Sequence, residues 1–275
     1  MVNKLVIDPI THPYVFDGLE YAKNVLSGKI VACVYVIGAC KRFFKDIDKG
    51  YFIFDIEKAE RYLRLVQLFN HVKGVWNTPN ITYDPWQNFC FMNIMGWIDP
   101  RTGSRRFRSA HIEVARGAGK SAMASQAVLF FLALDNPVGN EISCVSTKKD
   151  AARIVLDSAR AMAKKSKKYL QKTNVKVLAH KIVHDESNSF ARALSSDSES
   201  LDGLNDILAV MDELHAVQRK LFDVINSGMK KRRDSLMLCI TTAGFNKDGV
   251  GYSQSQYAKK VALGEVEDDQ MFAIV

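Results

Sequence analysis

The chain has 275 residues, of which 47% are hydrophobic and 25% are charged. These proportions are typical of globular proteins and exclude disordered and fibrous classes. The 38 Lys and Arg residues outnumber the 30 Asp and Glu residues and give a formal net charge of +8, which favours a polyanionic partner without identifying it.

Membrane and secreted classes are also disfavoured. No run reaches the roughly 18 uninterrupted apolar residues that a membrane span requires, since even the stretch 122–134 is short and contains Ser125 and Gln126. The N-terminus shows no secretory signal, and the five Cys residues are scattered without a C-x-x-C pair. We therefore expect a soluble cytoplasmic protein with reduced thiols and no membrane association.

Residues 1–78 are predicted to form a mainly helical N-terminal segment. Helices are expected over 17–26 and 55–72, and the apolar stretch 31–37 between them is ambiguous. The second helix is indicated by apolar residues at helical spacing, namely Ile56, Ala59, Tyr62, Leu63, Val66 and Phe69. Turn-forming Asn and Pro residues in 77–80 then predict a domain boundary near residue 78.

Residues 79–275 are predicted to form an α/β domain. Pro85 opens a helix over 86–97, and the polar loop 101–108 follows it. From there strands alternate with helices. The expected strands are 110–114, 141–145, 206–211 and 236–241, and the expected helices are 120–134, 151–170 and 217–229. Short apolar strands alternating with helices predict a mostly parallel central sheet covered by helices on both faces.

A phosphate-binding loop is predicted between the strand 110–114 and the helix that follows it. Its sequence is Ala115-Arg116-Gly117-Ala118-Gly119-Lys120-Ser121. Small residues let backbone N–H groups approach a triphosphate, Lys120 neutralises its β and γ oxygens, and Ser121 can ligate Mg²⁺. The full G-x-x-x-x-G-K-[ST] pattern is not met, because Val114 stands in place of its first glycine.

A pair of acids follows the buried strand 206–211. Asp212 would hold Mg²⁺ together with Ser121, and Glu213 would orient and deprotonate the attacking water. The alternative is that Asp212 only caps the next helix. Carboxylates at the carboxyl end of a strand lie at the edge where α/β proteins bind ligands, which favours the first interpretation.

Two further elements complete the predicted site. Thr241 and Thr242 end the strand 236–241 and are candidates for sensing the γ-phosphate, although an ordinary polar strand end is equally compatible with them. Gln87, in the segment 83–87, carries an amide that can pair with the adenine edge, or it is simply a residue on a helix surface.

These elements, in this order, resemble the ATPase domain of the large terminase subunit of tailed bacteriophages. The terminase loop commonly lacks the first glycine and carries an Arg where Arg116 stands. The segments 145–148, with Ala151, and 200–205 also resemble family motifs. The resemblance implies a P-loop NTPase of the additional-strand (ASCE, RecA-like) type that hydrolyses ATP with Mg²⁺ to ADP and phosphate. It implies catalytic roles for Lys120, Arg116 and Glu213.

The resemblance also implies partners. Large terminases drive double-stranded DNA into a procapsid, together with a small terminase subunit and a portal protein, as a homo-oligomeric ring. They act in the host cytoplasm and are not packaged in the virion. The family continues into a nuclease domain, and no nuclease residues are assigned in these 275 residues, so we expect an isolated motor domain or a truncated chain. A helicase-like DNA-dependent ATPase and a non-catalytic nucleic-acid-binding module remain the alternatives.

Other candidate residues are less specific. His180 and His184 have a metal-like spacing but lack a third ligand at metal-site spacing, so no zinc site is predicted. His215 completes a D-E-x-H sequence and either contacts the Thr241 segment or merely caps a helix. Three basic clusters could contact DNA or be solvated faces. They are Arg101, Arg105, Arg106 and Arg108; Lys164, Lys165, Lys167 and Lys168; and Lys230, Lys231, Arg232 and Arg233.

Overall fold

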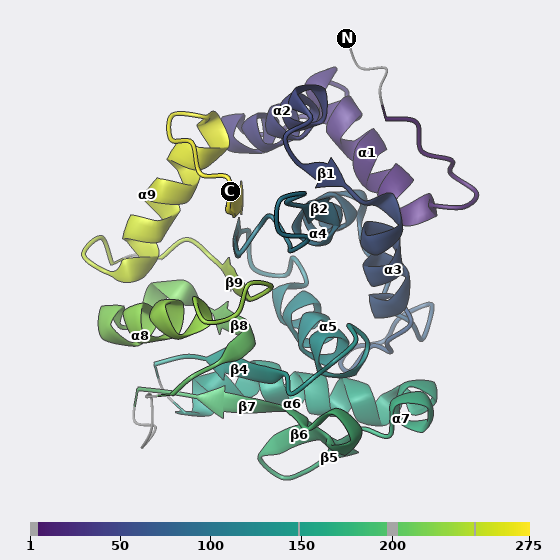
Figure 1. The fold of residues 1–275 in the computed structure, drawn as a ribbon, viewed down its shortest axis with the longest axis vertical. Coiled ribbons are helices and arrows are strands. Elements are labelled where there is room, and N and C mark those ends of the chain that lie inside the picture. Colours follow the sequence, from purple (N-terminus) through teal and green to yellow (C-terminus); the bar gives the residue numbers. More distant parts are fainter. Residues whose placement is uncertain (1–4, 148, 197–202, 245) are drawn as a thin grey trace. The chain divides into compact units, whose positions relative to one another are not determined.

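The computed structural model describes residues 5–147, 149–196, 203–244 and 246–275 (Figure 1). The chain forms two compact units that interleave along the sequence. The first consists of Met1–Gln67, Thr82–His111 and Gln256–Val275, and the second of Leu68–Ile81 and Ile112–Ser255. No single residue divides them, and residue 78 falls within a segment that packs with the second unit.

Helices dominate the N-terminal part of the first unit. They are α1 (Pro13–Leu26), α2 (Val34–Lys49), α3 (Ile56–Val66) and α4 (Pro85–Gly96), and β1 (Ile53–Phe54) pairs antiparallel with β2 (Trp97–Ile98). Helix α4 is buried from Gln87 to Gly96, and α1 and α3 pack against it. The Tyr62 and Phe91 rings stack with centroids 5.2 Å apart. An apolar helix without a polar face therefore forms the core of this unit.

Helix α2 resolves the ambiguous stretch 31–37, because Val34 begins a helix there. The helix ends at Gly50, whose φ of 65° gives the left-handed cap that glycine adopts most easily. The helix expected over 55–72 is shorter than predicted. It ends at Val66 because Asn70 pairs in a β-bridge with Asn80, which takes the chain out of the helix.

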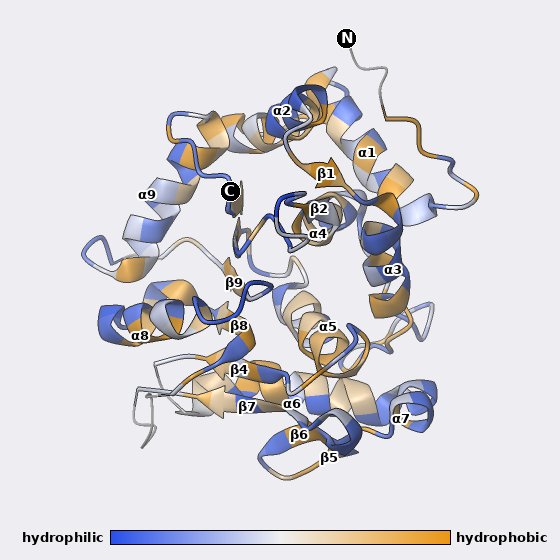
Figure 2. Ribbon diagram, in the orientation of Figure 1, coloured by the Kyte–Doolittle hydropathy of each residue, from blue (hydrophilic) through white to orange (hydrophobic). Residues whose placement is uncertain are grey.

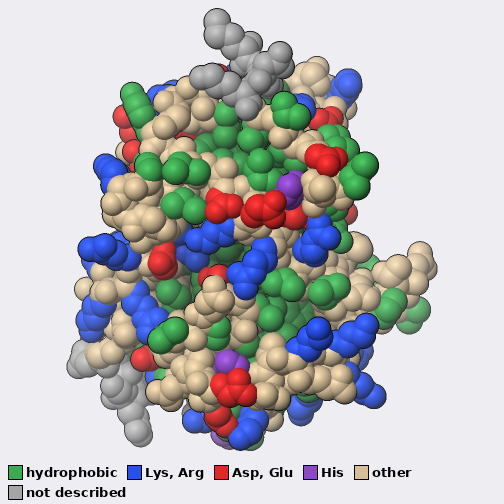
Figure 3. Space-filling view, turned by 45° about the vertical axis from the view of Figure 1, so that its right-hand side comes forward, with side chains coloured by type: hydrophobic (Ala, Val, Ile, Leu, Met, Phe, Trp, Pro, Cys, Tyr) green, Lys and Arg blue, Asp and Glu red, His purple; other side chains and the backbone are tan. Residues whose placement is uncertain are grey.

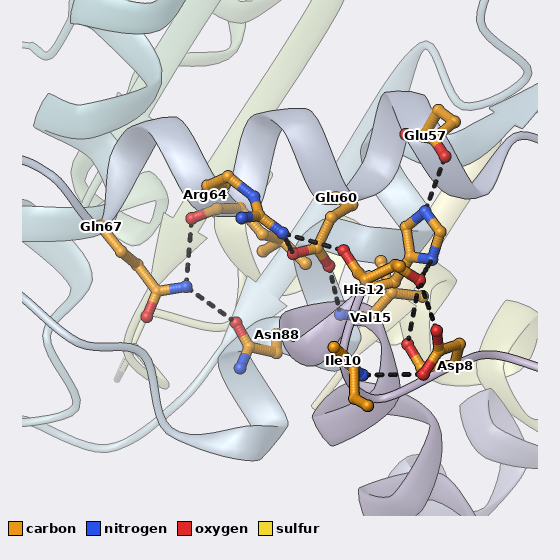
Figure 4. A network of polar contacts seen from close by, with 11 residues as sticks. Asp8, Ile10, His12, Val15, Glu57, Glu60, Arg64, Gln67 and Asn88 are labelled. Atoms are coloured by element: carbon orange, nitrogen blue, oxygen red, sulfur yellow. Dashed lines mark hydrogen bonds and ion pairs between the residues drawn. The ribbon is translucent and has the colours of Figure 1, made fainter.

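A polar network joins the start of α1 to α3 (Figure 4). Glu60 is 3% exposed, and its carboxylate accepts a hydrogen bond from the backbone N–H of Val15 at 3.0 Å. Arg64 pairs with the same carboxylate at 3.0 Å. Helix α1 has no side-chain cap from His12, so Glu60 satisfies one of its unpaired amides from another helix.

The first unit is completed by residues 256–275. These include the last turns of α9 (Val250–Leu263) and strand β10 (Met271–Ile274), which lies beside β3 (Ser109–Glu113) in the sheet. Arg42 donates to the carbonyl oxygens of Met271 at 2.8 Å and Asp268 at 2.6 Å. Hydrogen bonds thus join α2 to the C-terminal segment, more than 200 residues away in sequence.

The second unit contains the predicted parallel sheet. From the end of β3 its strand order is β3-β9-β8-β4-β7-β6-β5. The central pairs β8–β9, β4–β8 and β4–β7 are parallel, and the pairs β6–β7 and β5–β6 are antiparallel. The strands are β4 (Glu141–Val145), β5 (Lys176–Val177), β6 (Lys181–His184), β7 (Ser189–Leu194), β8 (Asp206–Asp212) and β9 (Leu236–Thr241).

Helices cover this sheet on both faces. Helix α8 (Arg219–Met229) packs on Ala209 and Met211 of β8, whereas Leu208 and Val210 point to the other face and are equally buried. Helix α5 (Lys120–Ala133), hydrophobic along most of its length in Figure 2, packs on the same strands and on α6. No helix in the described part of the chain has the length and apolarity to cross a bilayer.

The long helix expected over 151–170 is two helices, α6 (Lys149–Lys165) and α7 (Lys167–Thr173). Ser166 separates them with a ψ of 72°, outside the helical range. Its side chain accepts a hydrogen bond from the backbone N–H of Asn70 at 3.1 Å. A contact distant in sequence therefore breaks a helix that local periodicity predicts as continuous.

Candidate nucleotide-binding site

The predicted phosphate loop connects β3 to α5. Gly117 and Gly119 have φ values of 85° and 76°, which L-residues with side chains rarely adopt, so both glycines are required by the turn. Ala115, Arg116 and Gly117 are exposed, which opens the N-terminus of α5 to solvent. The backbone amides there and the helix dipole favour an anion.

The missing first glycine has a structural explanation. The backbone N–H of Val114 donates to the carbonyl oxygen of Thr241 at 3.0 Å, so this residue still continues the pairing between β3 and β9. An extended residue needs no glycine, and the loop turns only from Gly117 onward. The shorter glycine pattern therefore builds the same cradle.

Lys120 and Ser121 lie where phosphate-loop residues are expected to act. The ammonium group of Lys120 donates to the carbonyl oxygen of Ala115 at 2.9 Å, and the residue is 8% exposed. The Ser121 hydroxyl lies near the Asp212 carboxyl and favours its ionised form. The structure thus brings the phosphate loop and the first acid of the predicted pair together.

Asp212 is the last residue of β8 and caps no helix, since the N-cap of α8 is Gln218. The capping interpretation of Asp212 is therefore wrong. Burial raises the pKa of this carboxyl, and the neighbouring charge of Glu213 adds to the rise. Lys120 and Ser121 oppose it, because both stabilise the ionised form. A divalent cation held by Ser121 and Asp212 would add further positive charge beside this buried carboxylate.

Glu213 follows in a left-handed conformation, with φ 55° and ψ 53°. Its Oε2 atom accepts a hydrogen bond from Thr242 Oγ1 at 3.1 Å and lies 3.2 Å from His215 Nδ1. Among the described residues no donor is found for Oε1, and the side chain is 44% exposed. Thr242 and His215 both contact Oε2, so Oε1 remains available to accept a proton from water.

His215 connects this acid to the segment after β9. Its Nδ1 lies 3.4 Å from Thr241 Oγ1, which confirms the contact with the Thr241 segment and excludes a purely capping role. Gly244 and Gly251 press against His215 so closely that a Cβ on Gly251 would lie 2.8 Å from its backbone nitrogen. The sequence carries a weak signal for this contact, since two glycines flank Val250 at the start of α9.

The remaining predicted residues are less constrained by this geometry. Gln87 lies in the first unit, is 7% exposed, and accepts a hydrogen bond from the Asp84 backbone at 2.9 Å in a capping box. Arg116 is exposed.

Lys148 and residues 200–202 of the two family-like segments lie outside the described residues. Thr147 of the first segment contacts the carbonyl oxygen of Ala216, which sequence reasoning missed.

The family can now be assigned. A family model described as terminase large subunit, ATPase domain, matches residues 85–260, which is more than half of the chain. The chain belongs to this family. In this terminase chain β9 lies between the phosphate-loop strand β3 and the acid-bearing strand β8, as the additional-strand type of P-loop NTPase requires. The α/β prediction is confirmed.

Individual relatives of this terminase chain are distant. The terminase large subunit of Lactococcus phage p2 is 24% identical over 143 residues, which are 50% of this chain and 26% of that protein. Protein YmfN of Escherichia coli strain K12 is 36% identical over 75 residues, or 27% of this chain and 16% of that protein. The crystal structure of the HK97 bacteriophage large terminase superposes with a TM-score of 0.64 at 20% identity, covering 79% of this chain and 43% of that one. The chain thus spans less than half of each relative.

Proposed function

We propose that this chain binds ATP with Mg²⁺ and hydrolyses it to ADP and phosphate as the motor of viral DNA packaging. The observation that carries the proposal is that Lys120 and Ser121 of the phosphate loop lie close enough to Asp212, beside Glu213, to favour its ionised form. This proximity joins the phosphate loop to a pair of acids at the carboxyl edge of a parallel sheet. Membership of the terminase family supports the same reaction.

Each side chain has a distinct part in the proposed reaction. Lys120 exchanges the Ala115 carbonyl for the β and γ oxygens of the nucleotide, which the amides at the start of α5 also bind. Ser121 and Asp212 would hold Mg²⁺. The cation, when bound, neutralises charge that develops on the phosphates. Arg116 is the candidate arginine finger in cis, and Gln87 is the candidate contact to adenine.

Glu213 acts as the general base. Thr242 and His215 both hold Oε2, which fixes the carboxylate and leaves Oε1 to orient the attacking water and take its proton. Departure of the γ-phosphate alters what Thr242 and Thr241 contact. Since His215 contacts Thr241 and Gly244 lies against His215, hydrolysis would displace the segment that leads to α9.

The wider assembly follows from the family and is proposed for this chain on that basis. Double-stranded DNA is the translocated substrate, and a small terminase subunit, a portal protein and further copies of the chain in a ring are the partners. The motor would act in the host cytoplasm and remain outside the virion.

An ATPase assay with three variants tests the reaction. Lys120→Ala should abolish turnover by weakening nucleotide binding, and Glu213→Gln should bind ATP normally while turnover falls by about 10² to 10⁴, as expected for loss of a general base. Lys220→Ala, which removes an exposed lysine from α8, serves as the matched control and should be unchanged. Wild-type turnover in either site variant would contradict the proposal.

A further inference from the structure

A self-closed loop projects from the second unit between residues 69 and 81. Its two sides are joined by the β-bridge of Asn70 with Asn80 and by hydrogen bonds from His71 to Pro79 at 2.9 Å and from Ile81 to Phe69 at 2.8 Å. The loop is therefore ordered by its own backbone contacts.

The tip of the loop is apolar and exposed. The Trp76 indole N–H donates to the carbonyl oxygen of Lys73 at 2.6 Å, and its ring stacks on His71 with centroids 4.2 Å apart. Val75 is completely exposed and Trp76 is 59% exposed. A preformed aromatic surface that contacts little of its own chain is characteristic of a binding element.

The break between α6 and α7 anchors this loop. Ser166 accepts a hydrogen bond from Asn70, and the Lys165 ammonium group donates to the carbonyl oxygens of His71 at 3.2 Å and Val72 at 3.1 Å. Phe69 packs edge-on against Tyr169 with ring centroids 5.0 Å apart. The loop and the ends of the two helices therefore form one surface.

Lysines surround the loop. We call the exposed set the lysine platform, and it consists of Lys73, Lys164, Lys165, Lys167, Lys168 and Lys172. The segments 68–81 and 158–184 contain no Asp or Glu, and within the described residues none of the six lysines forms an ion pair. Figure 3 shows a protrusion that carries hydrophobic side chains, with Lys and Arg side chains in blue on the surface below it.

The other basic clusters differ from the platform. Arg105 and Arg106 are 5% and 2% exposed, and Arg106 is paired with Asp46 at 2.8 Å, so these two arginines form neither a solvated face nor a surface for DNA. Arg232 is held by Asn140 at 3.1 Å and by the Gly139 carbonyl oxygen, and Asp234 follows it in sequence. Of the three basic clusters, and within the described residues, only the platform combines exposed lysines that form no ion pair, flanking segments without acids and an aromatic tip.

From this combination, and resting on the function proposed above, we propose that the lysine platform and the Trp76 loop bind the phosphate backbone of double-stranded DNA. Lysines neutralise phosphates whatever the base sequence, which suits a protein that moves along DNA. The apolar tip lies against the sugar edge of a groove. His71 already covers one face of Trp76, so the loop offers no slot between two rings for an unstacked base of a single strand.

Binding of the full chain to a fluorescent DNA duplex over a salt series tests the platform. The triple variant Lys164→Ala, Lys167→Ala, Lys168→Ala should bind at least about tenfold more weakly, and the slope of log K against log salt should fall by about 2 to 3. The triple variant Lys230→Ala, Lys231→Ala, Arg233→Ala removes the same charge from the far end of α8. It should retain the wild-type affinity within about threefold.

The aromatic tip needs a separate measurement. Trp76→Ala should weaken duplex binding without changing the salt slope, and Trp76→Phe should restore most of the affinity, because the contact depends on a ring and not on charge. Unchanged binding by Trp76→Ala would remove the loop from the proposed surface.

Failure of the DNA-binding proposal can be distinguished from failure of the proposed ATPase function. Glu213→Gln should bind DNA as the wild type does, so a lost ATPase function would leave the binding result intact. Equal losses in both triple variants would overturn the proposal, since they would show that only net charge matters. Stronger binding of a single strand than of the duplex would also overturn it. Unchanged duplex binding by the platform variant would overturn it as well and would favour a protein partner for this surface.

Discussion

Glu213 occupies a backbone conformation that suits few residues with a side chain. Among the described residues, those other than glycine with positive φ are Asn136, Asn174, Asn188 and Glu213. Asparagine tolerates this region because its short amide bonds to the local backbone, whereas for other side chains the region costs about 1 kcal/mol or more. The strain at Glu213 coincides with its two contacts to Oε2, so the backbone directs the carboxylate where the proposed chemistry needs it.

A buried acid lies at the opposite end of β8 from Asp212. Asp206 begins β8 and is fully buried, and one of its carboxylate oxygens accepts a hydrogen bond from Ser143 at 3.0 Å. No partner for the other oxygen is found among the described residues. Burial raises the pKa of Asp206 to about 6, although Ser143, Arg192 and Arg232 favour the ionised form.

The raised pKa of Asp206 predicts a pH-dependent stability. Between about pH 4 and pH 6 the unfolded chain releases this proton and the folded chain keeps it, so the free energy of unfolding falls by up to about 3 kcal/mol and stays lower above pH 6. Asp206→Asn removes this fall. Denaturant titrations at pH 4.5 and pH 7 should show the variant gaining stability relative to wild type at the higher pH. The exposed Asp48→Asn control should not, and parallel pH profiles for wild type and Asp206→Asn would contradict the prediction.

At the scale of elements, helix α9 is coupled to the proposed catalytic acid through one glycine. A Cβ on Gly251 would lie 2.8 Å from the backbone nitrogen of His215 and 3.1 Å from the carbonyl carbon of Leu214. Backbone atoms cannot rotate away as a side chain can. Either the start of α9 or the histidine that holds Glu213 must move.

Gly251→Ala should therefore lower ATP turnover about tenfold or more and reduce stability by about 1 to 3 kcal/mol, as overpacking commonly does. Gly249→Ala is a close control, because its nearest neighbour is the flexible amide of Asn246 at 3.3 Å, and it should stay within about twofold of wild type. Steady-state turnover and thermal unfolding measure both effects. Wild-type turnover in Gly251→Ala would exclude the coupling through His215.

Elements whose signal is local could be predicted from sequence. Strands β4 and β9 match their predicted bounds, and α4 and α5 match within one residue, since Pro85 and the glycines at 117 and 119 mark their starts. Strand β7 and helix α9 were missed because neither carries a strong apolar period. The break at Ser166 depends on Asn70, 96 residues away, and could not be predicted. In the site, residue types identified Asp212 and Glu213, but only the fold reveals that Thr242 and His215 share one oxygen.

At the scale of the molecule, the two interleaved units make residues 1–78 indispensable to the rest of the chain. Helix α4 belongs to the predicted ATPase domain in sequence, yet its buried surface faces α1 and α3. Gly18 approaches the Phe89 backbone so closely that a Cβ would lie 2.9 Å from its nitrogen. A helix buried from Gln87 to Gly96 that loses such neighbours exposes a large hydrophobic surface.

A fragment covering residues 79–275 should therefore aggregate or fail to accumulate as a monomer. Removal of residues 1–6 alone, which leaves α1 to α3 intact, is the control and should give the elution profile of the full chain in size-exclusion chromatography. A monodisperse, cooperatively unfolding 79–275 fragment would show that the N-terminal helices are dispensable after all.

The position of β10 has a consequence for the order of events during synthesis. Helices α1 to α4 emerge from the ribosome first, but Arg42 obtains its partners at Asp268 and Met271 only when those residues have also been translated. The second unit ends at Ser255, before Asp268 and Met271 are translated. It can therefore fold while helices α1 to α4 still lack their C-terminal partners. A nascent chain that has emerged as far as residue 255 would thus carry strands β3 to β9 around the phosphate loop, while β10 and its contacts with Arg42 would still be missing.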